Sequence, residues 1–147
     1  MTNDVGNEIA DALAVLLKRS TRLKLYRALT TGLGEAVDEL TYPVLSGLAR
    51  SGPCSAAGLA LDVGLDRSGV TRRASRLEEA GLVRREPDPL DRRATLLALT
   101  DDGRRTVGIL RKRLSAHIET SLASWPADEA ATFARHLQRF VAEGPFA

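Results

Sequence analysis

The segment from Asp66 to Gly81 carries the side chains with the clearest chemical potential in this chain. At helical spacing, Val70, Ala74 and Leu77 form one apolar stripe. The rest of the helix surface gathers short hydroxyls and arginines, namely Ser68, Thr71, Arg72, Ser75 and Arg76, with Arg73 at the edge of the stripe. Ser and Thr let a helix approach DNA closely and hydrogen-bond to base edges or phosphates, and Arg reaches O6 and N7 of guanine. This pattern predicts a helix that reads the major groove, with Arg73 reaching a phosphate.

A second cationic element follows this helix. Residues 87–92 read Pro-Asp-Pro-Leu-Asp-Arg, a stiff polar loop that joins two predicted strands over 82–86 and 93–99. Arg92 and Arg93 lie at the tip of this hairpin or on its return strand, where an arginine can enter a narrow, electronegative minor groove. Because an aspartate is a poor DNA contact, we expect Asp91 to pair with a neighbouring arginine and to fix the shape of the loop.

The ends of the two central helices are specified by capping residues. Ser55 is a natural N-cap for a helix that ends at Gly64, and Asp66 is a natural N-cap for the next helix. Gly81 stands where a left-handed C-terminal cap belongs. Two short helices with a glycine-containing turn, followed by a two-stranded hairpin, make a winged helix-turn-helix. The predicted fold class is therefore mainly α with a small β-hairpin wing.

Amphipathic helices flank this unit on both sides. Residues 1–6 have no pattern, and the predicted flanking helices cover residues 7–31, a stretch from 41–43 to 51, residues 101–125 and a last helix that Pro126 opens. The first helix and the last two carry more apolar surface than one small lobe can cover. An uncovered amphipathic helix normally means a partner, so the sequence predicts a homodimer.

Composition bounds the class of protein. The chain has 147 residues and a net charge of +2, with 18 Arg and only 3 Lys. Residues 66–113 hold 13 Lys and Arg against 8 Asp and Glu, a local excess of five cations, whereas the rest of the chain is net acidic. Arginine suits forked contacts with phosphates and guanine. The length predicts one compact domain over residues 1–147.

The sequence also argues against several classes. It shows no catalytic motif and no Cys/His pattern for a metal, so we expect no enzyme activity, no cofactor and no metal site. With no secretory signal or membrane span in the sequence, the cytoplasm is the expected compartment. Cys54 is interpreted as a small buried packing residue rather than a redox sensor. Tyr26, Tyr42 and Trp125 are interpreted as core residues rather than the lining of an effector pocket.

The run from Leu48 to Gly103 resembles the MarR family of bacterial transcription regulators. The most specific part is the wing signature, Asp91-x-Arg93-Ala94 followed by Leu99-Thr100 and Gly103, after a join that reads Leu77-Glu78-x-x-Gly81-Leu82-Val83. The resemblance implies a homodimer whose dimerisation helices are residues 7–31 and 101–143, with a winged lobe over 42–99. It also implies a response to a small phenolic or anionic effector, whose binding residues the sequence does not identify.

The predicted function is therefore a sequence-specific, DNA-binding transcriptional regulator, most simply a repressor. As a dimer it would read half-sites about 10–10.5 bp apart, or a multiple of that, in a pseudo-palindromic operator. The partners expected are double-stranded DNA, a second copy of the chain and a small-molecule effector, with no membrane. The alternative is a winged-helix module that binds another protein instead of DNA.

Overall fold

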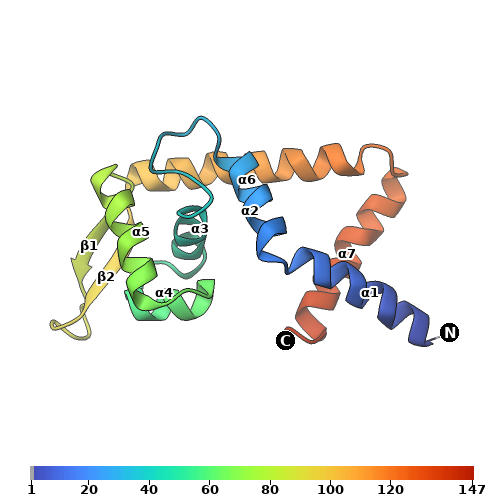
Figure 1. The fold of residues 1–147 in the computed structure, drawn as a ribbon, viewed down its shortest axis with the longest axis horizontal. Coiled ribbons are helices and arrows are strands. Elements are labelled where there is room, and N and C mark those ends of the chain that lie inside the picture. The colour runs from blue at the N-terminus through green and yellow to red at the C-terminus, as the bar shows by residue number, and fades with distance from the viewer. Residues whose placement is uncertain (1) are drawn as a thin grey trace. The chain divides into compact units, whose positions relative to one another are not determined.

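The computed structural model describes residues 2–147, and it describes side chains from residue 4 onward. Its helices are α1 (Thr2–Leu16), α2 (Arg19–Thr30), α3 (Tyr42–Ser51), α4 (Ala56–Val63), α5 (Arg67–Glu79), α6 (Asp101–Leu122) and α7 (Ala127–Glu143). The strands β1 (Val83–Pro87) and β2 (Thr95–Leu99) lie between α5 and α6 (Figure 1). The predicted fold class, mainly helical with a β-hairpin wing, is confirmed.

The N-terminal region differs from the prediction in two ways. Helix α1 begins at Thr2, so residues 2–6, for which no pattern was found, are helical. The single helix predicted over 7–31 is wrong, because the backbone of Lys18 is extended (φ −60°, ψ 135°) and separates α1 from α2. The five residues 18–22 are all polar and interrupt the apolar stripe. Residues 20 and 21 are also Ser and Thr, whose side chains compete for backbone hydrogen bonds.

Helices α4 and α5 form the helix-turn-helix, and the predicted caps are present. The Ser55 side chain accepts the N–H of Gly58 at 3.1 Å, and Gly64 is left-handed (φ 72°). Asp66 caps α5, and Gly81 is left-handed (φ 78°). Each cap satisfies a backbone group that the helix end leaves unpaired. Local chemistry therefore sets both ends of the turn that orients α5.

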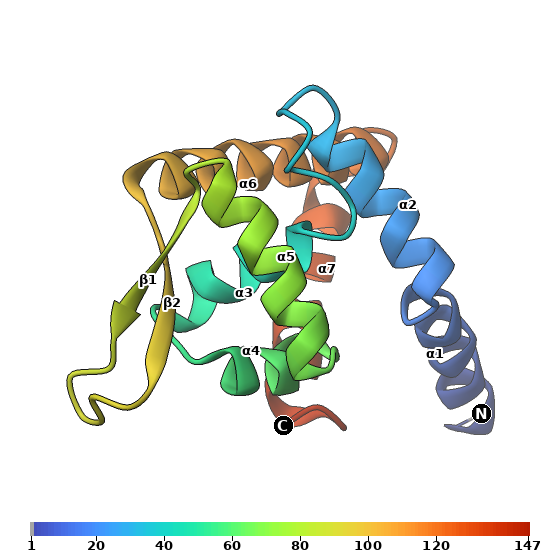
Figure 2. The same cartoon turned by 60° about the vertical axis from the view of Figure 1, so that its left-hand side comes forward.

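The wing is an antiparallel pair in which Val83 lies opposite Leu99 and Pro87 lies opposite Thr95. Cys54 adds a short bridge to this sheet, since its N–H and carbonyl both hydrogen-bond to Leu97, at 3.1 and 2.8 Å. Cys54, interpreted from the sequence as a small buried packing residue, is half-buried. Figure 2 shows the hairpin beside α5, with its loop projecting away from the helices.

The core lies between α3, α4, α5 and the hairpin, with one wall from α2. Most of its fully or almost fully buried side chains are apolar, and the buried polar ones are Thr30 and Thr41. The apolar ones include Leu29, Val44, Leu45, Leu48, Leu59, Val70, Ala74, Leu77, Val83 and Leu97. The stripe predicted for α5 is among them, so α5 is anchored by one face and presents the other.

The chain divides into two compact parts, residues 1–111 and 112–147. In the second part, none of the residues of α7 is buried, and Phe133, Leu137 and Val141 are 43–51% exposed. In the first part, Val5, Ile9 and Leu16 of α1 are similarly exposed. Both parts therefore carry apolar surface that the chain itself leaves open. None of the helices between residues 2 and 147 has the combination of length and hydropathy needed to cross a membrane.

Candidate nucleic-acid interface

The first turn of α5 is organised around Asp66. Its carboxylate accepts the backbone N–H of Gly69 at 2.7 Å and the hydroxyl of Ser68 at 3.2 Å. These hydrogen bonds hold the pKa of Asp66 below its usual value. Gly69 is buried, and a Cβ there would lie 2.6 Å from Oδ1 of Asp66. A larger residue at position 69 would therefore require the Asp66 carboxylate to shift, and Ser68 is bound into the same cap.

The outer face of α5 presents Arg72. This side chain is exposed and, within residues 4–147, has no carboxylate at ion-pair distance. The hydroxyls of Thr71 and Ser75 donate to carbonyls one turn back, each at 2.9 Å. Their oxygens retain lone pairs that can accept from a base amino group. Arg72 is thus the cation of this face that is left to bind an external acceptor.

Arg85 of β1 connects the wing to α5. It donates to the hydroxyl of Ser75 at 3.2 Å and to the carboxylate of Glu78 at 3.3 Å. Ser75, predicted to contact DNA, is therefore also a link between the helix and the wing. Sequence reasoning did not single out Arg85. A signal was present in the sequence: Arg84 and Arg85 are adjacent on a predicted strand, so their side chains must point to opposite faces.

A cleft of about 410 Å³ lies between the start of α4, the start of α5 and the wing. Three arginines from three elements line it: Arg67 of α5, Arg85 of β1 and Arg93 of the wing loop, together with Thr71 and Ser55. Of these arginines, only Arg85 has a carboxylate partner within the described part of the chain. Guanidinium groups that line one cleft can bind phosphate oxygens. Arg67, which sequence reasoning also missed, follows directly after the N-cap Asp66.

The wing loop lacks the ion pair that was expected between Asp91 and a neighbouring arginine, among the side chains that the structure describes. The Asp91 carboxylate accepts the backbone N–H of Arg93 at 3.0 Å, and among the described side chains it has no arginine at ion-pair distance. Asp91 therefore shapes the loop through the backbone, and Arg92 and Arg93 are both exposed.

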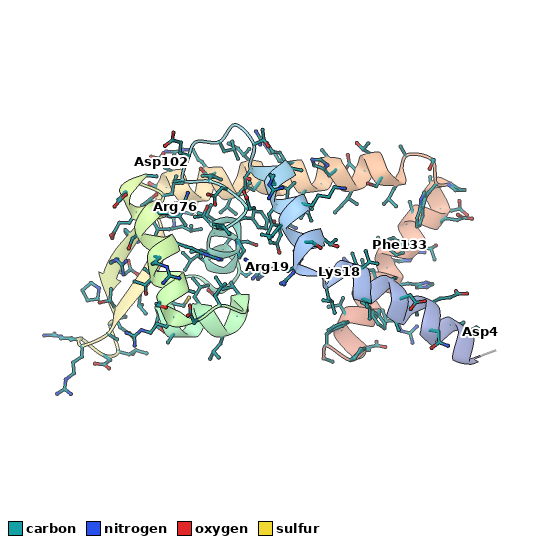
Figure 3. All side chains as sticks on the ribbon, viewed as in Figure 1. Asp4, Lys18, Arg19, Arg76, Asp102 and Phe133 are labelled. Atoms are coloured by element: carbon teal, nitrogen blue, oxygen red, sulfur yellow. The ribbon has the colours of Figure 1, made fainter. Side chains whose placement is uncertain are left out.

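Arg76, on the outer face of α5 by prediction, lies against the loop before α3 (labelled in Figure 3). Its guanidinium donates to Asp38 at 2.7 Å and to the carbonyl of Glu35 at 3.0 Å. Burial acts to raise the pKa of Asp38, but hydrogen bonds from Arg76, Thr41 and Leu40 outweigh it and lower that pKa below 3.8. The structure thus gives Arg76 an internal partner and separates it from Arg72.

Arg73 points away from the cleft and lines a different cavity of about 300 Å³. Arg19, Arg22 and Tyr26 of α2 also line it, together with Glu39 and Pro43. Tyr26, interpreted from the sequence as a core residue, thus lines a cavity, and its ring stacks on Tyr42 at 4.4 Å. Burial lowers the pKa of Arg73, and the nearby Arg19 lowers it further. The cavity therefore gathers cations that repel one another.

Comparison with known proteins gives a match to the MarR family model over residues 37–94. The chain is 30% identical over 103 residues to the uncharacterized HTH-type transcriptional regulator YxaD of Bacillus subtilis, a match that covers 70% of this chain and 72% of YxaD. The chain belongs to the MarR family. It is also 33% identical over 99 residues to the uncharacterized HTH-type transcriptional regulator YdgJ of Bacillus subtilis, a match that covers 67% of this chain and 58% of YdgJ.

Solved structures resemble the chain over nearly its whole length. Rv1404 from Mycobacterium tuberculosis has a TM-score of 0.72 at 27% identity and covers 95% of this chain and 94% of its own. The PcaV regulator from Streptomyces coelicolor, solved with its natural ligand, has a TM-score of 0.59 at 29% identity over 93% and 92% of the two chains. The MarR relatives are transcriptional regulators rather than enzymes, and they do not favour a protein-binding module as the alternative function.

Proposed function

We propose that this MarR-family protein binds duplex DNA as a homodimer in the cytoplasm and regulates transcription in response to a small anionic effector. The observation that carries the DNA-binding part is a group of arginines around the start of α5 and the wing that have no carboxylate partner among the described side chains. Arg67 and Arg93 line the cleft, and Arg72 is exposed on α5.

The arrangement supports a division of roles among these side chains. Arg72, with the hydroxyls of Ser68, Thr71 and Ser75, faces the bases of the major groove. Arg67, Arg85 and Arg93 hold a phosphate in the cleft, and Arg92 follows the minor groove. Arg76 and Asp91 position the helix and the wing loop, whereas Arg73 serves the cavity.

The experiment begins with selection of bound sites from a random DNA pool, followed by anisotropy measurements of affinity at several salt concentrations. Arg72→Ala should relax the preference at one base-pair position, because a lost base contact costs about 1–3 kcal/mol of discrimination. Arg67→Ala should weaken all sequences alike and reduce the salt slope by about 0.9. Arg139→Ala on α7 is the charge-matched control. Wild-type binding that ignores both sequence and salt contradicts the proposal.

The dimer part rests on the exposed apolar side chains of α1 and α7. Phe133 (labelled in Figure 3), Leu137 and Val141 follow one face of α7 and remain 43–51% exposed, although the Phe133 ring also contacts Trp125 at 5.3 Å. A second copy supplies the same surface by two-fold symmetry. Sedimentation analysis should therefore find a dimer at micromolar concentration, and a monomer at that concentration contradicts this part.

The effector part rests on the cavity that Arg19, Arg22 and Arg73 line opposite a single carboxylate, Glu39. An anion relieves the repulsion among these arginines, and the stacked tyrosines beside them suit an aromatic ring. Aromatic carboxylates should raise the melting temperature of the wild type and lower its DNA affinity, whereas their neutral amides should do neither. Arg19→Ala should lose this response and Arg139→Ala should keep it. An equal response to acid and amide contradicts the assignment.

A further inference from the structure

The wing tip presents an apolar side chain that the DNA-binding arginines do not explain. Leu90 is 96% exposed, the highest value for a large apolar side chain between residues 4 and 147. Its neighbours in the sequence are Pro89 and the charged Asp91 and Arg92, and all three are exposed. Water on every side of a leucine is unfavourable, so burial against any apolar surface stabilises it.

The backbone around Leu90 is fixed. The N–H of Leu90 donates to the Asp88 carboxylate at 2.9 Å, and the N–H of Asp91 donates to the Asp88 carbonyl at 3.3 Å. The base of the loop is closed by the N–H of Asp88, which donates to the Ala94 carbonyl at 3.0 Å. Pro87 and Pro89 restrict the chain on either side. The backbone of Leu90 is therefore held in place before anything binds, which lowers the backbone entropy lost when the side chain makes a contact.

We propose that Leu90 is an apolar wedge that enters the minor groove beside Arg92, a role that rests on the DNA binding proposed above. The walls of that groove are largely deoxyribose carbons, and minor-groove proteins insert leucine or proline against or between base steps. Arg92 and Arg93 supply the attraction to the electronegative groove, and the carboxylates of Asp88 and Asp91 are turned to backbone N–H groups. The wedge favours a flexible pyrimidine–purine step where the wing meets the DNA.

The test compares Leu90→Gln with wild type on the selected operator. Leu61 on α4, 89% exposed, offers a matched control as Leu61→Gln. Leu90→Gln should bind about tenfold more weakly, which corresponds to about 1.4 kcal/mol, at an unchanged salt slope, because an apolar contact releases no counterions. It should also lose the preference for a pyrimidine–purine step at the outer positions. Leu61→Gln should match wild type in both measurements, and Arg92→Ala should instead reduce the slope.

The experiment distinguishes a failure of the Leu90 wedge from a failure of the proposed DNA binding. If wild type binds the operator and Leu90→Gln binds equally well with the same outer base preference, the wedge is wrong and DNA binding stands. The same conclusion follows if Leu61→Gln loses as much affinity as Leu90→Gln. If wild type binds no DNA in the selection, the proposed function itself fails. Melting curves of both variants should coincide with wild type, because neither side chain is buried.

Discussion

Replacing Asp38 by alanine should lower the free energy of unfolding more than replacing its partner Arg76 by alanine. One oxygen of the Asp38 carboxylate accepts the backbone N–H groups of Leu40 and Thr41, at 2.9 and 3.0 Å. The other oxygen accepts Arg76 at 2.7 Å. Thr41 is fully buried, so its N–H has no access to water once the carboxylate is gone. The variant Asp38→Ala therefore removes two hydrogen bonds to backbone N–H groups as well as an ion pair.

The two effects differ in size. A buried N–H left without an acceptor costs about 1–3 kcal/mol. The ion pair joins side chains that are 31% and 41% exposed, and a pair in such surroundings contributes about 0.2–1 kcal/mol. Asp38→Ala should therefore lower the free energy of unfolding by about 2–3 kcal/mol, and Arg76→Ala by about 0.5–1 kcal/mol.

Urea unfolding at one fixed protomer concentration measures both values, because the stability of a dimer depends on concentration. The double variant isolates the coupling between the two side chains, which should not exceed about 1 kcal/mol. Equal losses for the two single variants would refute the reasoning, since the backbone hydrogen bonds would then contribute nothing beyond the pair. Arg76→Ala should also retain the base preference of wild type on the selected operator. A relaxed preference at one position would mean that Arg76 leaves Asp38 to read a base.

Three further predictions concern pH, packing and assembly. The pKa of Asp38 is lowered in the folded state, so the ionised carboxylate stabilises the fold above about pH 4, and this stabilisation is lost as the pH falls through the pKa of the folded protein. In urea unfolding between about pH 5 and 2, Asp38→Asn should therefore show a smaller fall in the free energy of unfolding than wild type. Gly103→Ala should lower the free energy of unfolding by about 1–3 kcal/mol, because the added Cβ meets the Leu82 carbonyl oxygen, and a thermal melt identical to wild type would contradict this. Leu137→Asp should give a monomer in sedimentation analysis while Arg139→Ala remains a dimer, since only the former places a charge on the exposed apolar face of α7.

The winged helix-turn-helix was predictable because capping residues close to each helix end determine its boundaries. Ser55 and Asp66 each cap a helix with their own side chain, and Gly64 and Gly81 take the left-handed conformation that ends one. Each of these signals acts between residues no more than about four positions apart. Signals of such short range can be read from a single sequence. The break at Lys18 lacks such a signal, because neither Gly nor Pro marks it.

The site was predicted less completely, because partners distant in sequence decide where an arginine points. A helical wheel places Arg72 and Arg76 on one face, yet Asp38, 38 residues upstream, binds Arg76 and not Arg72. The wheel also puts Arg73 at the edge of the buried stripe, but only the position of α2 reveals that Arg73 shares a cavity with Arg19. Helical periodicity predicts the direction in which a side chain points, but it does not predict which residues from other elements contact that side chain.

The distribution of carboxylates decides which part of the local positive charge can face DNA. Within residues 66–113, the arginines that pair with carboxylates include Arg76, Arg84, Arg85, Arg104 and Arg105. The carboxylates of Asp66, Asp88 and Asp91 accept backbone N–H groups and shape the first turn of α5 and the wing loop. Arg67, Arg72, Arg92 and Arg93 are consequently left exposed without an ion-pair partner among the described residues, at the start of α5 and on the wing. We expect DNA to supply the negative charge beside these four arginines without disturbing the pairs that hold the helix and the wing in place.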